Sequence, residues 1–303
     1  MNYTPMSLSE GFRAISTEEQ AREWFWRERF GGKEFECPRC EEHGYWQHHA
    51  SPELRQCTVC LHVVRLRASG MVRHSKLPLL AWIHALMLLT ADKRGVSALA
   101  LQRHLGLGSY RTAWLMLHKV RLALWLRDER YQLQGTVELD GASIGSRAAE
   151  NQDGILVAIE SRTYVDKKGR SKVVAGFAKC EVAPETTAAA EDFLKRAVKP
   201  STQVNTDASS ALVAIEGFDT DHRKMGHDKE ELDAWLPHAF HFVENAKSWL
   251  VGTCHGIRKK YLPFYAAEYT YRFNRRNSQD TMFHHALRAI SNGVPVPRRM
   301  LCA

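Results

Sequence analysis

Two aspartates, each within or at the end of a short apolar segment, could bind divalent metal ions. Asp140 lies in Thr136–Gly145 (TVELDGASIG), which has a strand-like pattern, and Asp207 ends the shorter strand-like stretch Thr202–Asp207 (TQVNTD). A carboxylate inside a strand is costly to bury unless something compensates its charge, and a metal ion is one candidate. Either aspartate alone is more simply explained as a strand-end or turn residue, so the metal-site hypothesis depends on the set.

A third oxygen ligand could come from the helical segment Phe240–Gly256 (FHFVENAKSWLVGTCHG). Two strand carboxylates and one helix-borne oxygen are hard ligands, suited to the two Mg²⁺ ions of a phosphoryl-transfer site. Neighbouring helix residues point about 100° apart, so Glu244 and Asn245 are not equivalent. Asn245 shares a face with Trp249, whereas Glu244 precedes Lys247 by three residues, the spacing of a surface ion pair. We predict Asn245 as the third ligand, with Glu244 as the alternative.

Four cysteines have the clearest metal-ligand spacing in the chain. Cys37 and Cys40 form one CxxC motif, and Cys57 and Cys60 form a second. Two such motifs together supply a tetrahedral set of thiolates, with the spacing of a zinc ribbon. In a reducing compartment this pattern favours a metal over disulfides, and the doubled motif disfavours four unligated core residues. Because four protein ligands close the site, we expect a structural Zn²⁺ and no catalytic role for it.

Length and composition are those of a globular protein with more than one domain. The chain has 303 residues, with 44% hydrophobic and 25% charged residues. The net charge of +8 favours a polyanionic partner, although basic proteins that bind no nucleic acid are common. We find no apolar run close to the ~20 residues of a membrane span and no apolar signal core at the N-terminus. A soluble, intracellular protein is therefore expected.

The elements that would hold these residues begin with two helices. Residues 17–30 are predicted to be helical, with Ser16 as the cap and Glu19 completing a capping box. Residues 76–92 (KLPLLAWIHALMLLTAD) form an apolar helix after Pro78.

Two further helices follow, separated by a glycine-containing turn, with Ser97 and Ser109 as N-caps. This is the pattern of a helix-turn-helix, whose second helix enters the major groove with its first residues. Tyr110, Arg111 and Thr112 would then face DNA. A plain helical hairpin with a solvated face is the alternative.

From Thr136 onward strands dominate. Strands are predicted over 136–145, 154–161, 172–182 and 202–207, helices over 184–198, 208–216, 238–256 and 261–274, and an irregular polar insertion over 217–236. The aromatic stripe of the last helix is more typical of a core than of a base-stacking surface. Residues 292–303 are expected to be loose.

The motifs together resemble the zinc-ribbon insertion-sequence transposases of the ISXO2-like group. The resemblance covers about residues 15 to 285 and rests on these runs: CPRC and CTVC, LPLLAWIHALMLL, TAWLMLHKVRLAL, VELDGASIG, VNTD, the NxKxWLxGTxHG run at Asn245–Gly256, and FNRR at Phe273–Arg276. It implies a multidomain α+β protein with an N-terminal zinc ribbon, a helix-turn-helix and an RNase H-like mixed α/β catalytic domain. Carried over residue by residue, the catalytic and metal-binding triad is Asp140, Asp207 and Asn245. The family usually has an acid directly after the first aspartate, where this chain has Gly141.

The implied domain boundaries follow the motifs. They are an N-terminal helical segment at 1–34, the zinc ribbon at 35–70, a helical DNA-binding region at 71–130, the catalytic domain at 131–285 and a tail at 286–303.

The implied activity is that of a bacterial DNA transposase. It is a metal-dependent phosphoryl transferase that uses Mg²⁺ or Mn²⁺ to cleave DNA at terminal inverted repeats and to transfer the strand to a target. Its partners would be the transposon ends, target DNA and further copies of the chain on those ends, in the bacterial cytoplasm at the nucleoid. The residues that would hold phosphates are Lys247, His255, Lys259, Lys260, Arg275 and Arg276. For the cations an ordinary solvated basic face is the alternative, and for His255 a structural role.

Two other functions remain open at this point. One is a catalytically inactive or domesticated transposase-derived protein that still binds DNA. The other is an RNase H-like nuclease that hydrolyses DNA without strand transfer.

Overall fold

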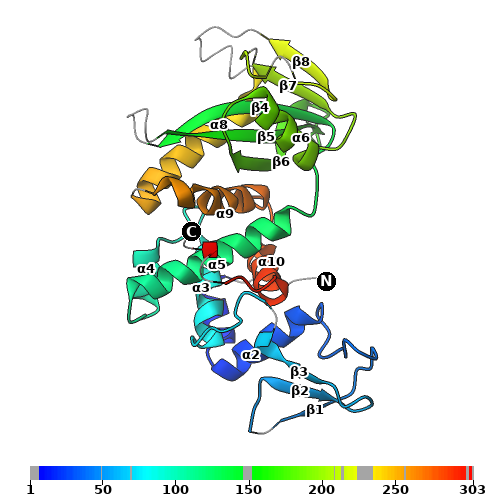
Figure 1. Cartoon of the computed structure of the whole chain (residues 1–303), viewed down its shortest axis with the longest axis vertical. Helices are drawn as coiled ribbons and strands as arrows, with labels where there is room; N and C mark the ends of the chain where they lie inside the picture. The colour runs from blue at the N-terminus through cyan, green and yellow to red at the C-terminus, as the bar shows by residue number, and fades with distance from the viewer. Residues whose placement is uncertain are drawn as a thin grey trace. The chain divides into compact units, whose positions relative to one another are not determined.

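The computed structural model describes residues 7–48, 50–68, 70–145, 152–207, 209–212, 215–223, 235–255, 257–297 and 300–301 (Figure 1). The chain divides into two compact units, one of Met1–Arg127 with Arg275–Ala303 and the other of Asp128–Asn274. Within the described ranges, every helix is too short or too polar to cross a membrane.

The first unit contains a small antiparallel sheet in the order β1-β2-β3, made by β1 (Tyr45–Gln47), β2 (Leu54–Cys57) and β3 (Val63–Arg65). These strands run between and after the two CxxC motifs, as the zinc-ribbon prediction requires. A single 3₁₀ turn, η1 (Leu66–Ala68), leads out of the sheet.

Helices make up the rest of this unit. They are α1 (Leu8–Ala14), α2 (Glu18–Arg29), α3 (Leu79–Ala91), α4 (Ala98–His104), α5 (Tyr110–Asp128) and α10 (Gln279–Asn292). The predicted apolar helix is confirmed as α3, whereas α1 was not predicted. The predicted cap of α2 is wrong by one residue, because Thr17 caps the helix and Gln20 completes the capping box. Gln20 also accepts a hydrogen bond from the Ser16 N–H, so Ser16 joins this cap without forming it.

The C-terminal helix α10 packs against α2 and α3, so the end of the chain belongs to the N-terminal unit. Its last residue, Asn292, donates a side-chain hydrogen bond to the Glu28 carbonyl at 2.9 Å. Gly70, at φ +83°, lies so close to the Ile290 carbonyl that a Cβ would come within 2.6 Å of that oxygen. This helix continues past residue 286, where the sequence analysis begins the tail.

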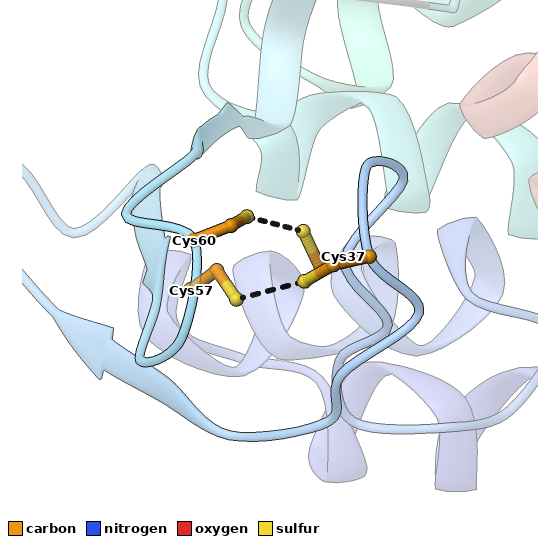
Figure 2. A group of neighbouring side chains, drawn as sticks. Cys37, Cys57 and Cys60 are labelled. Carbon is orange, nitrogen blue, oxygen red and sulfur yellow. Dashed lines mark hydrogen bonds between the residues drawn. The ribbon is translucent and has the colours of Figure 1, made fainter.

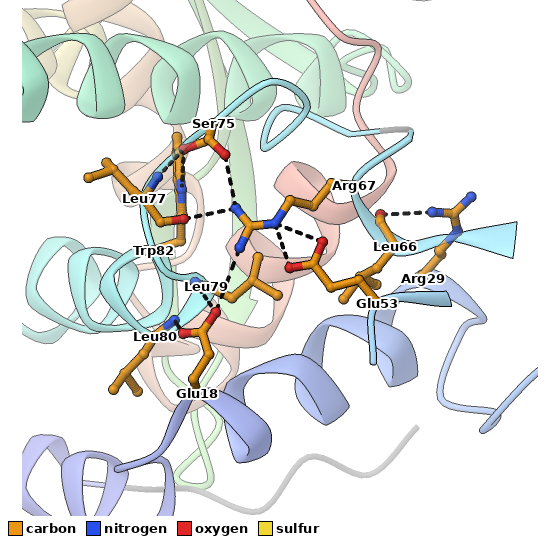
Figure 3. A network of polar contacts seen from close by, with 10 residues as sticks. All are labelled: Glu18, Arg29, Glu53, Leu66, Arg67, Ser75, Leu77, Leu79, Leu80 and Trp82. Atoms are coloured by element: carbon orange, nitrogen blue, oxygen red, sulfur yellow. Dashed lines mark hydrogen bonds and ion pairs between the residues drawn. The ribbon is translucent and has the colours of Figure 1, made fainter. Parts of the chain in front are cut away.

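A polar network fastens the ribbon to the helices of the same unit (Figure 3). Arg67, which follows β3, donates to Glu53 at 2.8 Å and to the Leu77 carbonyl at 2.8 Å, and forms an ion pair with Glu18 at 3.6 Å. Glu18 in turn accepts the N–H groups of Leu79 and Leu80 at 2.8 and 2.9 Å. Since the N-cap of α3 is a proline with no side-chain acceptor, Glu18 supplies the missing cap from α2.

The second unit is built on one five-stranded sheet in the order β6-β5-β4-β7-β8. The strands are β4 (Thr136–Gly145), β5 (Gln152–Val165), β6 (Ser171–Val182), β7 (Gln203–Asp207) and β8 (Asp219–Arg223). β4, β5 and β6 pair antiparallel, whereas β7 and β8 pair parallel to β4. Numbered within the unit, the order is third, second, first, fourth, fifth, which is the mixed sheet of an RNase H-like domain.

Helices cover both faces of this sheet. On one face, α6 (Thr187–Ala197) packs on Val137 and Leu139 of β4 and on neighbouring residues of β5 and β7. On the other face, α8 (Pro237–Trp249) and α9 (Leu262–Asn274) pack on Ile144 of β4 and on the opposite side of β5. Odd-numbered residues of β4 therefore face α6, and even-numbered residues, which include Asp140, face α8.

Three sequence-based expectations for this unit differ from the structure. β5 and β6 extend into the stretch predicted as a hairpin loop, so that only residues 166–170 form the turn. The helix predicted over 208–216 is absent from its described residues, 209–212 and 215–216, and its remaining residues lie outside the described part of the chain. The insertion predicted over 217–236 begins with β8, whose polar sequence hides a strand because its pairing with β7 is non-local. Residues 224–234 of that insertion lie outside the described ranges.

The aromatic stripe of α9 is mostly core, as predicted. Tyr265 and Tyr271 are buried, and Phe273 packs edge-on against Phe242 of α8 at 5.0 Å. Asn274, which ends α9, pairs with the backbone of β6 through both its amide groups: Oδ1 accepts the Ala178 N–H at 2.7 Å, and Nδ2 donates to the Ala178 carbonyl at 3.0 Å.

Candidate active site and zinc centre

The two aspartates predicted to bind metal lie side by side on adjacent strands. The parallel pairing of β4 with β7 runs to Leu139 opposite Thr206, so Asp140 and Asp207 occupy the next position on each strand. Because side chains alternate along both strands in register, both carboxylates lie on the face that α8 covers. The structure thus brings together residues that are far apart in the sequence.

The electrostatics at this position suit a cation. Burial raises the pKa of Asp140 to about 7, with further contributions from the negative charges of Asp207 and Glu185 and an opposing one from Lys247. Burial also raises the pKa of Asp207, and the Glu185 charge adds to it. The Asp207 Oδ1 atom is buried and has no hydrogen-bond partner. An unsatisfied buried acceptor beside a second carboxylate is a place where a hard cation fits.

Glu185 was not singled out in the sequence. It lies between β6 and α6, directly before Thr186, which caps α6. Its carboxyl group lies against Gly141, where an added Cβ would come within 2.5 Å of the Glu185 Cδ and Oε2 atoms. An acid just before a helix is expected for its favourable interaction with the helix dipole, so no local signal connects Glu185 to β4.

The helix α8, which carries the third predicted ligand, is anchored by another acid of β4. Glu138 is 2% exposed, and its Oε2 atom accepts the His238 and Ala239 N–H groups at 2.8 and 2.9 Å. The N-cap residue of α8, Leu236, has no side-chain acceptor, so Glu138 supplies the cap from the sheet. This contact sets where α8 begins relative to the strand that carries Asp140.

On α8, the Glu244 carboxylate accepts a hydrogen bond from Lys247 at 3.1 Å, which is the surface contact that their spacing suggests. Asn245 is exposed, and its side chain makes no hydrogen bond within the described part of the chain. Lys247 is half-buried, and its charge reaches Asp140. The role of Asn245 as a ligand stays a prediction.

The other predicted phosphate-binding residues fall into two groups. His255, Lys259 and Lys260 are exposed; His255 follows a π-helical turn, η3 (Leu250–Cys254), in the left-handed conformation at φ +49°, and the lysines lie in η4 (Lys259–Tyr261). Arg275 is 7% exposed and Arg276 is half-buried, and both belong to the first unit. Little of the Arg275 side chain is therefore open to a phosphate.

The predicted DNA-reading residues begin α5 in the first unit. Ser97 and Ser109 cap α4 and α5 as predicted, by accepting the N–H groups of Ala100 and Thr112, both at 3.2 Å. The turn between the helices contains Gly106 at φ +60°, a conformation that favours glycine. Tyr110 is 52% exposed and Arg111 is exposed, so the first turn of α5 is open to a partner.

The four cysteines of the ribbon converge on one point. Their sulfur atoms all lie within 4.8 Å of one another, and the Cys37–Cys60 and Cys40–Cys57 pairs are each 3.5 Å apart. Figure 2 shows Cys57 and Cys60 on one loop pointing toward Cys37 on the other. Four sulfurs around a Zn²⁺ at about 2.3 Å lie about 3.8 Å apart, so the observed cluster fits one zinc ion with little movement.

The two loops of this cluster share one backbone conformation. The first cysteine of each motif donates its N–H to the carbonyl five residues on, Cys37 to Glu42 at 2.8 Å and Cys57 to His62 at 2.9 Å. The residue after each second cysteine, Glu41 or Leu61, is left-handed, at φ +59° and +60°. Two matched loops are what a shared tetrahedral metal requires.

Comparison with known proteins gives one result for the second unit. Residues 132–274 match the family model of the ISXO2-like transposase domain. No curated protein and no solved structure gives a significant match. The matched range contains β4, β7 and α8, and therefore Asp140, Asp207 and Asn245.

Proposed function

Residues 132–274 belong to the ISXO2-like transposase domain family, and on this basis we propose that the chain cleaves and joins DNA at the ends of a bacterial insertion sequence. The observation that carries the proposal is the pair Asp140 and Asp207. They are neighbours in the matched domain, and one buried carboxylate oxygen has no hydrogen-bond partner. Phosphoryl transfer through hard divalent cations needs oxygen ligands placed in this way.

The residues that would hold two Mg²⁺ or Mn²⁺ ions are Asp140, Asp207 and Asn245. When bound, such ions activate a water or a 3′-OH as nucleophile and stabilise the leaving oxygen of an in-line displacement, so no covalent enzyme intermediate is needed. Asp140 and Asp207 hold their carboxylates on adjacent strands, which fixes the spacing between them. Glu138 fixes the start of α8 and thereby the helix that presents Asn245 and Lys247.

The cationic residues would position DNA. Lys259 and Lys260 are exposed beside the end of the α8 segment, where they would act as point charges on phosphates. Tyr110 and Arg111 would contact base edges from the start of α5 in the first unit. The cysteine cluster would hold one Zn²⁺ that stabilises the ribbon and takes no part in the reaction.

The test compares single variants on a duplex that carries the element's terminal repeats. Asp140→Asn and Asp207→Asn should each lower Mg²⁺-dependent cleavage by orders of magnitude while leaving DNA binding within about twofold of wild type. Asp192→Asn is the matched control, because Asp192 is an exposed acid on α6 paired with Arg196. Near wild-type cleavage by either active-site variant would overturn the proposal.

A second assay uses pre-cleaved ends with a free 3′-OH and a target plasmid. Joined products are expected with wild type and absent with Asp140→Asn. Cleavage without joining would instead identify a nuclease, and DNA binding without cleavage would identify a binding protein derived from a transposase.

A further inference from the structure

Glu185 lies where a third carboxylate would complete the site, and Gly141 makes the room for it. The Cγ, Cδ and Oε2 atoms of Glu185 lie 2.5–2.7 Å from the position that a Cβ of Gly141 would occupy. Gly141 is not among the residues with positive φ, so its backbone conformation does not demand glycine. What the missing side chain provides is space for the Glu185 carboxyl group directly beside Asp140.

Both sides of the sheet are open to the same gap at this point. The pairing of β4 with β7 ends at Leu139 and Thr206, while β4 continues to Gly145. Gly141 is therefore beyond the paired part of β7, on a stretch of β4 that is an edge on that side. A group reaching this edge from the α6 side meets the one presented from the α8 side. The Glu185 charge accordingly acts on both Asp140 and Asp207.

Other acids around α6 have basic partners, and Glu185 does not. Glu181 and Asp192 both pair with Arg196, at 2.8 and 3.0 Å, and Glu191 pairs with Lys195 at 3.6 Å. Within the described ranges Glu185 has no ion pair, although it lies beside two further carboxylates. Three neighbouring acids and one lysine leave an uncompensated negative charge that a cation would neutralise.

We propose, on the basis of the proposed function, that Glu185 is a further ligand of the catalytic metal ions, together with Asp140 and Asp207. The site then carries three carboxylates even though Asn245 is neutral, and ligand charge count is a main determinant of affinity for hard divalent cations. Gly141 is a specific requirement of this arrangement, because a side chain there would displace the Glu185 carboxylate.

The test measures metal binding directly, on the full-length protein with zinc in the ribbon and no other divalent ion. Mn²⁺ binding is followed by the electron paramagnetic resonance signal of the free ion. Glu185→Gln, which keeps the size and removes the charge, should weaken Mn²⁺ binding at least about tenfold. Glu191→Gln, the same change at a paired acid of α6, should stay within about twofold of wild type. Wild-type Mn²⁺ affinity in Glu185→Gln would overturn the proposal.

A second readout separates a ligand from a structural residue. Without Mn²⁺, Glu185→Gln should melt at a higher temperature than wild type, because it removes a like charge beside Asp140, and it should gain less on adding Mn²⁺. A structural role would lower the melting temperature instead, and that result also overturns the proposal. Gly141→Ala should weaken Mn²⁺ binding in wild type but add little in Glu185→Gln, since both changes act through one carboxylate.

Asp140→Asn distinguishes failure of this inference from failure of the proposed function. If Asp140→Asn loses Mn²⁺ binding and Glu185→Gln keeps it, Glu185 alone is misassigned. If Asp140→Asn binds Mn²⁺ as wild type does, the metal site itself is misplaced and both proposals fall.

Discussion

Replacing Asp140 with asparagine should stabilise the protein in the absence of Mg²⁺ or Mn²⁺, although it removes a residue needed for activity. The pKa of this buried carboxyl is raised from 3.8 to about 7 in the folded protein, first by burial and then by its acidic neighbours. A folded-state pKa above the unfolded one means that the folded protein binds the proton more tightly. The resulting stability is fully present below about pH 4 and is lost as the pH rises through about 7.

The size of the effect follows from the shift. The difference between about 7 and 3.8 is about 3 pKa units, which corresponds to roughly 4 kcal/mol at 1.36 kcal/mol per unit once the group is fully ionised. Asparagine has nearly the same shape and does not ionise, so Asp140→Asn avoids this loss. For a unit of this size, 1 kcal/mol moves the melting temperature by about 2–4 °C, so roughly 8 °C or more is expected at pH 8.

The assay is thermal unfolding of wild type and Asp140→Asn at pH 5 and pH 8, with zinc in the ribbon and no added Mg²⁺. The variant should exceed wild type clearly at pH 8 and by less at pH 5, where wild-type Asp140 is mostly protonated. Adding Mg²⁺ should raise the melting temperature of wild type only. Asp192→Asn should show no pH-dependent gain, because its carboxylate is exposed. The reasoning fails if Asp140→Asn melts below wild type at pH 8, or if its gain is the same at both pH values.

Three further outcomes are expected. Cys57→Ser should abolish stoichiometric zinc in elemental analysis and unfold residues ~35–66, because metal binding and folding of a ribbon are coupled; full zinc content in that variant would contradict the S₄ site. Asn245→Ala should lose metal-dependent cleavage strongly and Glu244→Ala only mildly, since Glu244 is paired with Lys247; the reverse order would make Glu244 the third ligand. Glu138→Ala should cost about 3 kcal/mol, because two α8 N–H groups lose a charged acceptor; unchanged unfolding by denaturant would show that the cap is replaceable.

Features that depend on neighbouring residues were readable from the sequence. The four cysteines announce a zinc site because a CxxC loop is a local structure, and both loops do adopt the same conformation. Ser97 and Ser109 cap their helices because a cap bonds only two or three residues away. The cap of α2 was misplaced by one residue, since Ser16 and Thr17 are both acceptable caps and only the folded chain distinguishes them.

The tertiary structure alone decided the features that join distant segments. Glu18 and Glu138 cap helices whose own N-cap residues have no acceptor, and nothing beside those helices in the chain reveals the donors' partner. β8 looks polar and irregular until it pairs with β7, because strand formation depends on the neighbour that supplies its hydrogen bonds. Glu185 comes to Gly141 only when the sheet closes and α6 packs against it. Local spacing therefore identified which residues could do chemistry, whereas the long-range packing of sheet and helices decided which of them meet.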